Sequence, residues 1–191
     1  MKDYFVAVWA KLLGIGSIRV VATNHLVERA KSKLSWRLAY SHIDALINVS
    51  ECAKAEFLSS PKLQNVFKRV YVVKNTVPSR SSRLHDNAVK HIPIKVLYHG
   101  RIHKEKGILD LVSHWHKVQN AVLYIAGSGE PVPDIPNVVY LGFHTDVRDL
   151  LAECDISVSP SIARESGGPL SLIEAMAAGK PVVASDNGSQ P

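Results

Sequence analysis

Cysteine is scarce in this chain, and no long apolar run is present. Only Cys52 and Cys154 occur among 191 residues, and neither has a cysteine or histidine neighbour at metal-ligand spacing. This pattern argues against a disulfide framework and a structural zinc site, and it fits a reducing compartment. The run Phe5–Gly16 contains Lys11 and is shorter than the roughly 20 residues that span a bilayer. It predicts a helix packed on a sheet.

Acidic residues are outnumbered by basic ones. The chain has 23 Lys and Arg against 17 Asp and Glu, giving a net charge of +6 and a pI of about 9.3. Positive charge is concentrated in Lys62–Arg83 and Arg101–Lys106, which suits anionic small molecules, acidic membranes or nucleic acid, or is simply a basic surface. No recognised nucleic-acid-binding motif accompanies these cations, so we expect no nucleic-acid partner.

Helix-like and strand-like segments alternate along the chain. Before residue 75 the predicted helices are Asp3–Leu13, Leu34–His42 and Glu51–Leu58, the last capped by Ser50, and the predicted strands are Ile18–Thr23, Ala45–Val49 and Arg69–Val73. After residue 93 the predicted strands are Ile94–Tyr98, Ala121–Ala126, Val138–Leu141, Ile156–Ser159 and Pro181–Ala184, and the predicted helices are Ile108–Val118, Val147–Glu153 and Pro169–Ala178. Such alternation is typical of doubly wound parallel α/β sheets. The polar stretch between the halves predicts domains 1–76 and 94–191 joined by a linker, 77–93.

Polar and glycine-rich loops follow the predicted strands of the second half. Arg101 and Lys106 flank a tight loop before a helix start, which together suit an anion such as a diphosphate. Gly127-Ser128-Gly129 follows the next strand, and Ser159–Ser161 leads to Glu165 and the Gly167-Gly168 turn. Because ligands of such sheets bind beyond the carboxyl ends of the strands, these loops predict a site at one sheet edge.

Glu174 lies in the predicted helix Pro169–Ala178, which is apolar nearly all round and is therefore expected to be buried. A buried carboxylate without a partner costs several kcal/mol, or becomes neutral. Glu174 is therefore expected to face a cleft or a fixed polar partner. The alternative is that its carboxylate caps a nearby backbone turn.

Five motifs carry a resemblance to a known family. GRIHKEKG, IAGSGE, NVVYLGF, DISVSPS and ESGGPLSLIEAMAAGKPVVAS occur in the order and spacing of the retaining glycosyltransferase family four, also called group 1. Upstream, RVVATNH, ALINVSECAKAEF and VVKNTV are similar to segments of its first domain and interdomain connection. The resemblance covers residues 18–187 and implies a GT-B fold. Its two Rossmann-like domains would be an acceptor-side domain and a nucleotide-sugar-binding domain, both partial.

The resemblance implies roles for individual residues. Arg101 and Lys106 match the basic pair that holds the donor diphosphate, and His25 matches a first-domain histidine near the transferred sugar, although it is also read as an ordinary loop histidine. Glu174 matches the second glutamate of the E-x7-E signature, which contacts ribose. The other implied donor-site residues are Glu165, Ser166, Gly167, Gly168, Pro169, Leu170, Gly127, Gly142 and Phe143.

The chain also departs from the family pattern. Glu165 lies nine residues before Glu174 and Ser166 lies eight before it, so either residue takes the first signature position; we favour Glu165. The 191 residues, which end at Pro191, lack parts of both family domains. This predicts that the chain alone is inactive.

The expected activity is metal-free transfer, with retention, from a nucleoside-diphosphate sugar (UDP- or GDP-linked) to a carbohydrate or lipid-linked acceptor hydroxyl. The expected location is cytoplasmic, with peripheral contact of the basic, apolar N-terminal helices to a membrane. The alternatives are a non-catalytic nucleotide-sugar-binding module or structural remnant, and a related phosphorylase.

Overall fold

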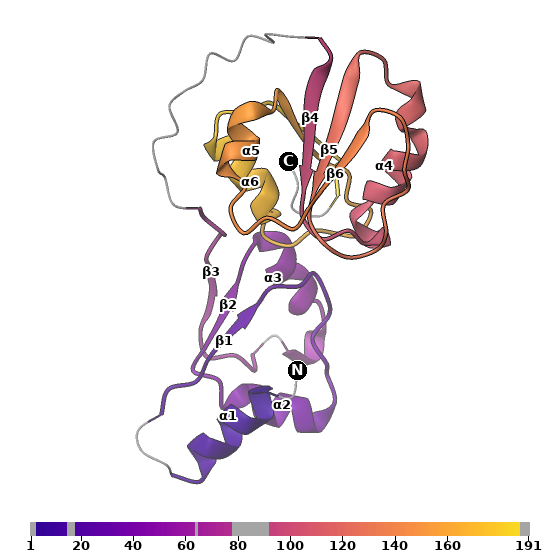
Figure 1. The fold of residues 1–191 in the computed structure, drawn as a ribbon. Coiled ribbons are helices and arrows are strands. Elements are labelled where there is room, and N and C mark those ends of the chain that lie inside the picture. Colours follow the sequence, from indigo (N-terminus) through magenta and orange to yellow (C-terminus); the bar gives the residue numbers. More distant parts are fainter. Residues whose placement is uncertain (1–2, 15–17, 64, 78–91, 188–191) are drawn as a thin grey trace. The chain divides into compact units, whose positions relative to one another are not determined.

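The computed structural model describes residues 3–14, 18–63, 65–77 and 92–187 (Figure 1). The chain divides into two compact units, the first made of residues 1–75 with 165–167 and the second of residues 76–164 with 168–191. The division after Asn75 lies next to the predicted end of the first domain, whereas residues 165–167 fall inside the predicted range 94–191. Most of the predicted linker 77–93 lies outside the described residues.

The first unit is a three-stranded parallel sheet with helices. Its strands are β1 (Val21–Asn24), β2 (Ala45–Asn48) and β3 (Val70–Val72), in the order β1-β2-β3, and its helices are α1 (Asp3–Leu12), α2 (Leu34–Ser41), α3 (Glu51–Phe57) and the 3₁₀ turn η1 (Pro61–Leu63). The predicted strand start at Ile18 is wrong. The Val20 N–H donates to the Asp44 carboxylate at 2.8 Å rather than to a neighbouring strand, so the ladder begins at Val21.

Side-chain contacts fasten the helices of this unit to its sheet. The Lys11 ammonium on α1 donates to Asp44 Oδ2 at 2.5 Å and to the His42 carbonyl at 3.1 Å. The hydrogen bond from Lys11 holds the pKa of Asp44 below its usual value. The predicted Ser50 cap is confirmed, because its hydroxyl accepts the Ala53 N–H at 3.0 Å.

None of the helices in the described part of the chain has the length and apolar character needed to cross a bilayer.

The second unit is a five-stranded parallel sheet in the order β6-β5-β4-β7-β8. The strands are β4 (Ile94–His99), β5 (Ala121–Ala126), β6 (Val138–Gly142), β7 (Ile156–Ser159) and β8 (Val182–Ala184), and the helices are η2 (Lys104–Lys106), α4 (Ile108–His114), η3 (Trp115–Lys117), α5 (Arg148–Glu153) and α6 (Leu170–Ala177). The predicted α-helix to Val118 is too long. The α-helix ends at His114 and the chain tightens into the 3₁₀ turn η3, whose Trp115 is 4% exposed.

Alternate residues of β4 serve two different cores. Val96 and Tyr98 pack in the cluster that contains Ile108 and Val112 of α4, whereas Leu97 packs in the cluster that contains Ala175 of α6. In Figure 1, α4 lies on one side of β4 and the pair α5 and α6 on the other. Side chains of a strand alternate between the two faces of the sheet. The side chain of His99, which follows Tyr98, therefore points to the face on which α6 packs.

Helix α6 is only partly buried, so the prediction that it is buried all round is wrong. Leu172 and Ala175 are buried, but Leu170 is 54% exposed and Met176 is 59% exposed. The helix packs on the sheet through one stripe, as a surface helix does. Its other faces remain exposed despite their apolar side chains.

Candidate functional site

Two loops interlock at the carboxyl edge of the second sheet. All five strands are parallel, so the loops after them emerge at one edge. The Gly100 N–H donates to the Ala126 carbonyl at 3.0 Å and the Ile102 N–H to the Ser128 carbonyl at 2.8 Å. The Ile102 carbonyl accepts the Glu130 N–H at 2.8 Å. The loops after β4 and β5 therefore form one hydrogen-bonded framework at this edge.

Two glycines are required by the closeness of the backbones in this framework. A Cβ on Gly127 would lie 1.9 Å from the Gly100 carbonyl oxygen, and one on Gly107 would lie 1.9 Å from the Pro160 carbonyl oxygen. Gly107 also has a φ of 65°, in the left-handed region. The loop after β7 joins the same framework, because the Ile162 N–H donates to the Glu105 carbonyl at 2.9 Å.

The two predicted cations extend from this loop framework. Arg101 is exposed, and its carbonyl accepts the Tyr98 hydroxyl at 2.6 Å. Lys106 is half-buried in η2, and its N–H donates to the His103 carbonyl at 2.8 Å. Both side chains therefore start from backbone positions that hydrogen bonds fix. A preorganised pair of cations suits an anion better than two mobile ones.

Glu174 on α6 has a fixed polar partner, and that partner is His99 at the end of β4. The distance from His99 Nε2 to Glu174 Oε2 is 3.2 Å. The side chain of His99 is 6% exposed and that of Glu174 is 40% exposed. The contact places the Glu174 carboxylate beside the carboxyl end of β4, the strand that leads directly to Arg101.

His99 was missed from the sequence, which predicted that β4 ends at Tyr98. The available signal was a polar residue that continues an apolar strand, Ile94–His99. Burial lowers the pKa of His99 from its usual 6.5, while the Glu174 carboxylate acts in the opposite direction. The net direction is downward, so the imidazole is neutral at pH 7.

This lowered pKa predicts that stability falls on acidification. Unfolded chains take up a proton at His99 below about pH 6.5, whereas the folded chain takes it up only at lower pH. The stabilisation from neutral His99 is therefore complete above pH 6.5 and is lost as the pH falls below it. We expect His99→Gln to remove this part of the pH dependence.

The measurement is urea unfolding at pH 5.5 and 7.5, followed by Trp115 fluorescence in a background with Trp9→Phe and Trp36→Phe. Trp115 lies in the second unit and the other two in the first. If stability falls equally between pH 7.5 and 5.5 with and without His99→Gln, the lowered pKa assigned to His99 is contradicted.

The remaining predicted residues of the second unit lie in two places. Gly142 ends β6, and Phe143, which follows it, is 68% exposed. The Gly127 carbonyl, on the neighbouring loop, accepts the Tyr140 hydroxyl at 3.0 Å. Gly168, Pro169 and Leu170 form the entry to α6, with Gly168 at a φ of 71° and Pro169 at the N-cap.

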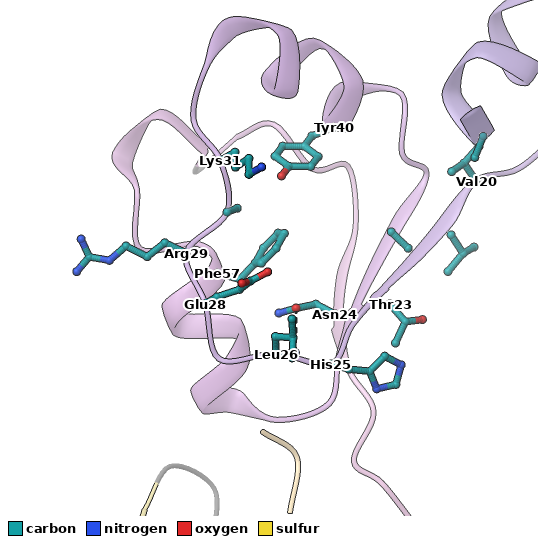
Figure 2. A pocket seen from close by; sticks show the side chains of 14 residues that line it. Val20, Thr23, Asn24, His25, Leu26, Glu28, Arg29, Lys31, Tyr40 and Phe57 are labelled. Atoms are coloured by element: carbon teal, nitrogen blue, oxygen red, sulfur yellow. Dashed lines mark hydrogen bonds between the residues drawn. The ribbon is translucent and has the colours of Figure 1, made fainter. Parts of the chain in front are cut away.

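Other predicted residues belong to the first unit. Residues 165–167, which include Glu165, Ser166 and Gly167, are part of it, and the Ser166 hydroxyl donates to the His25 carbonyl. Beside β1 lies a cavity of about 510 Å³ (Figure 2). Figure 2 shows Asn24, Glu28 and Phe57 pointing into it, whereas Arg29 extends away.

Two further features of the described residues concern the Cys154 thiol and the grouping of possible metal ligands. Burial raises the pKa of the Cys154 thiol to about 11, so it is not a reactive thiolate. Within the described ranges, no three His, Cys, Asp or Glu side chains are grouped to hold a metal ion.

Comparison with known proteins points to one family. The family profile described as "Glycosyl transferases group 1" matches residues 93–191, which is 99 of the 191 residues. A curated relative from Campylobacter jejuni is 49% identical over 49 residues, 26% of this chain and 12% of the relative. That protein is an N,N'-diacetylbacillosaminyl-diphospho-undecaprenol alpha-1,3-N-acetylgalactosaminyltransferase.

Solved structures share the fold at low sequence identity. Anabaena HepE, in a complex with UDP and glucose, has a TM-score of 0.74 and 20% identity over 98% of this chain and 57% of its own. TarM of S. aureus has a TM-score of 0.68 and 21% identity over 91% of this chain and 38% of its own. This chain therefore spans little more than half of HepE and a small part of the curated relative.

Proposed function

Because this chain belongs to the group 1 glycosyl transferases, we propose that its second unit binds a nucleoside-diphosphate sugar at the carboxyl edge of its sheet. The fold is of the GT-B type. The observation that carries the proposal is the position of Glu174, which His99 holds beside the end of β4. Arg101 and Lys106 follow the same strand, so a carboxylate for hydroxyl groups and two cations for a diphosphate share one edge.

The proposed reaction is transfer of the sugar to an acceptor hydroxyl with retention of configuration. The bond between the sugar and the diphosphate breaks, the acceptor oxygen bonds to the same sugar carbon, and the proton of the acceptor hydroxyl passes to the leaving nucleoside diphosphate. The diphosphate gains negative charge as its bond to the sugar breaks. Arg101 and Lys106 would stabilise that charge without a metal ion, because fixed cations aimed at a developing anion lower the barrier. Glu174 would accept hydrogen bonds from the ribose hydroxyls, and the exposed Phe143 and the loop at Gly127 would line the base.

The residues at the entry to α6 have proposed roles at the other end of the donor. Gly168, Pro169 and Leu170 would contact the sugar and phosphates, chiefly through backbone groups. Glu165 is proposed for the first signature position, with Ser166 as the alternative, and His25 would approach the transferred sugar. These roles rest on the family pattern.

The test of donor binding is a calorimetric titration of the purified chain with UDP, UDP-glucose and GDP. We expect saturable binding of at least one nucleotide, and comparison of UDP with GDP identifies the base. Absence of binding to all three would leave the alternative of a structural remnant. We also propose that the chain alone does not transfer sugar, since it spans 57% of HepE; UDP release that depends on an added acceptor would overturn this.

The first unit is the proposed acceptor side. Its cavity beside β1 has polar groups, Asn24 and Glu28, which suit carbohydrate hydroxyls. The outer face of α1 exposes Val6 (69%) and Trp9 (61%), and Leu13, directly after the helix, is 70% exposed. A basic protein with such a helix suits contact with an anionic membrane surface. Co-sedimentation with anionic vesicles that is unchanged by Trp9→Ser would count against a lipid-facing α1 and a peripheral location.

A further inference from the structure

The buried imidazole of His99 needs an explanation, because it lies where an apolar residue would be less costly. The three preceding residues of β4, Val96, Leu97 and Tyr98, are buried in the two cores. Burying a polar ring costs free energy unless hydrogen bonds compensate. The hydrogen bond that His99 makes is to Glu174 on α6, at 3.2 Å.

The surroundings of His99 define which nitrogen carries the proton. Nδ1 is buried and has no hydrogen-bond partner among the described residues. An imidazolium, or the tautomer protonated at Nδ1, would leave an N–H buried and unpaired, which costs more than an unpaired lone pair. In the remaining form Nε2–H donates to Glu174 and Nδ1 holds only a lone pair.

A neutral donor has a particular effect on a carboxylate. It restrains the side chain without adding a positive charge, so the Glu174 carboxylate keeps its strength as an acceptor. One oxygen, Oε2, contacts His99, and the side chain as a whole remains 40% exposed. The Glu174 carboxylate can therefore still accept hydrogen bonds from a ligand that lies beyond the edge of the sheet. A lysine or arginine at position 99 would restrain the carboxylate but also offset its charge.

We propose that His99 is a positioning residue that fixes Glu174 for the vicinal hydroxyls of a ribose, and so makes the site select ribonucleoside over 2′-deoxyribonucleoside diphosphates. This inference rests on the proposed function, in which Glu174 contacts the ribose. Without the donor from His99, the glutamate side chain can adopt several rotamers, and most of them do not direct both oxygens at one ligand. The role of His99 is therefore exerted through Glu174.

The test compares the affinities of UDP and 2′-deoxy-UDP by calorimetry for the wild type, His99→Leu, His99→Gln and Glu174→Gln. Leucine keeps the bulk and suits a buried site, but removes the donor. Glutamine carries an N–H near the position of Nε2. A hydrogen bond to a charged group typically changes an affinity by about a factor of ten or more. We therefore expect His99→Leu to weaken UDP binding about tenfold and to lower the preference for UDP over 2′-deoxy-UDP. His99→Gln should retain most of the UDP affinity and most of the preference for UDP over 2′-deoxy-UDP.

The outcomes separate this inference from the proposed function. If Glu174→Gln weakens UDP but His99→Leu does not, Glu174 is a ribose contact and His99 does not position it. If His99→Leu and His99→Gln weaken UDP equally, the imidazole acts through packing, and the inference is wrong. If Glu174→Gln has no effect on UDP, the proposed role of Glu174 fails first.

Two further measurements test the inference without relying on the effect of one substitution alone. His99→Leu should cause no additional loss in the Glu174→Gln background, because the two residues act through one contact. The ¹⁵N chemical shifts of the His99 ring should show protonation at Nε2 alone at pH 7. Protonation at Nδ1, or at both nitrogens, would contradict the assignment of the donor.

Discussion

Replacing Arg101 by alanine is expected to weaken UDP binding by about ten- to a hundredfold, which corresponds to the typical 1.5–3 kcal/mol of a hydrogen bond to a charged group. The same range applies to Lys106→Ala. The Arg101 carbonyl accepts the Tyr98 hydroxyl and the Lys106 N–H donates to the His103 carbonyl, so the backbone from which each cation extends is already fixed in the free protein. The double variant should show no measurable binding.

The matched control is Lys117→Ala. Lys117 is an exposed cation in η3, which precedes β5 and therefore lies near the amino edge of the same sheet. Its removal lowers the net charge by the same amount, and the UDP affinity should change by less than about twofold, because screening limits distant exposed charges. Equal losses for Lys117→Ala and Arg101→Ala would show that nucleotide binding responds to net charge, and would refute a defined site.

The second expected result concerns Gly107, which joins the loop after β4 to α4. Gly107→Ala should lower the free energy of unfolding of the second unit by about 3 kcal/mol or more. A left-handed φ costs a non-glycine residue about 1–2 kcal/mol, and the new Cβ would lie 1.9 Å from the Pro160 carbonyl oxygen. Either the loop that contains Gly107 or the loop that contains Pro160 must therefore move.

Gly142→Ala separates the two contributions. Gly142 also has a left-handed φ, 78°, but a Cβ there would meet no atom within 4 Å. It should therefore cost only the conformational part, about 1–2 kcal/mol. Urea unfolding followed by Trp115 fluorescence gives both values. If the two substitutions cost the same, the close approach of Gly107 to Pro160 is not a determinant of stability.

The sheet of the second unit was predictable because its strands are short, β-branched and bounded by clear breakers. β5 and β7 have the predicted bounds, and Gly127 ends the apolar run of β5. Periodicity also located α6, but it could not tell which face packs, so Met176 was wrongly expected to be buried. Exposure depends on neighbours that are distant in sequence.

The same limit applied to the site. Local patterns and the family resemblance were enough to propose Arg101, Lys106 and Glu174 as candidate site residues. The contact of His99 with Glu174 could not be predicted, because the two residues lie 75 positions apart and only the folded sheet brings them together. The reason for a glycine at position 107 is likewise a carbonyl oxygen from another loop.

Backbone ¹H–¹⁵N chemical shifts, recorded while UDP is added to the purified chain, locate the nucleotide on the protein. The largest changes should occur at the amides of Gly100–Gly107, Gly127–Gly129 and the first turn of α6, with little change near Lys117 at the opposite edge. Changes confined to the cavity beside β1, or spread evenly over the basic surface, would contradict a nucleotide site at the carboxyl edge of the second sheet.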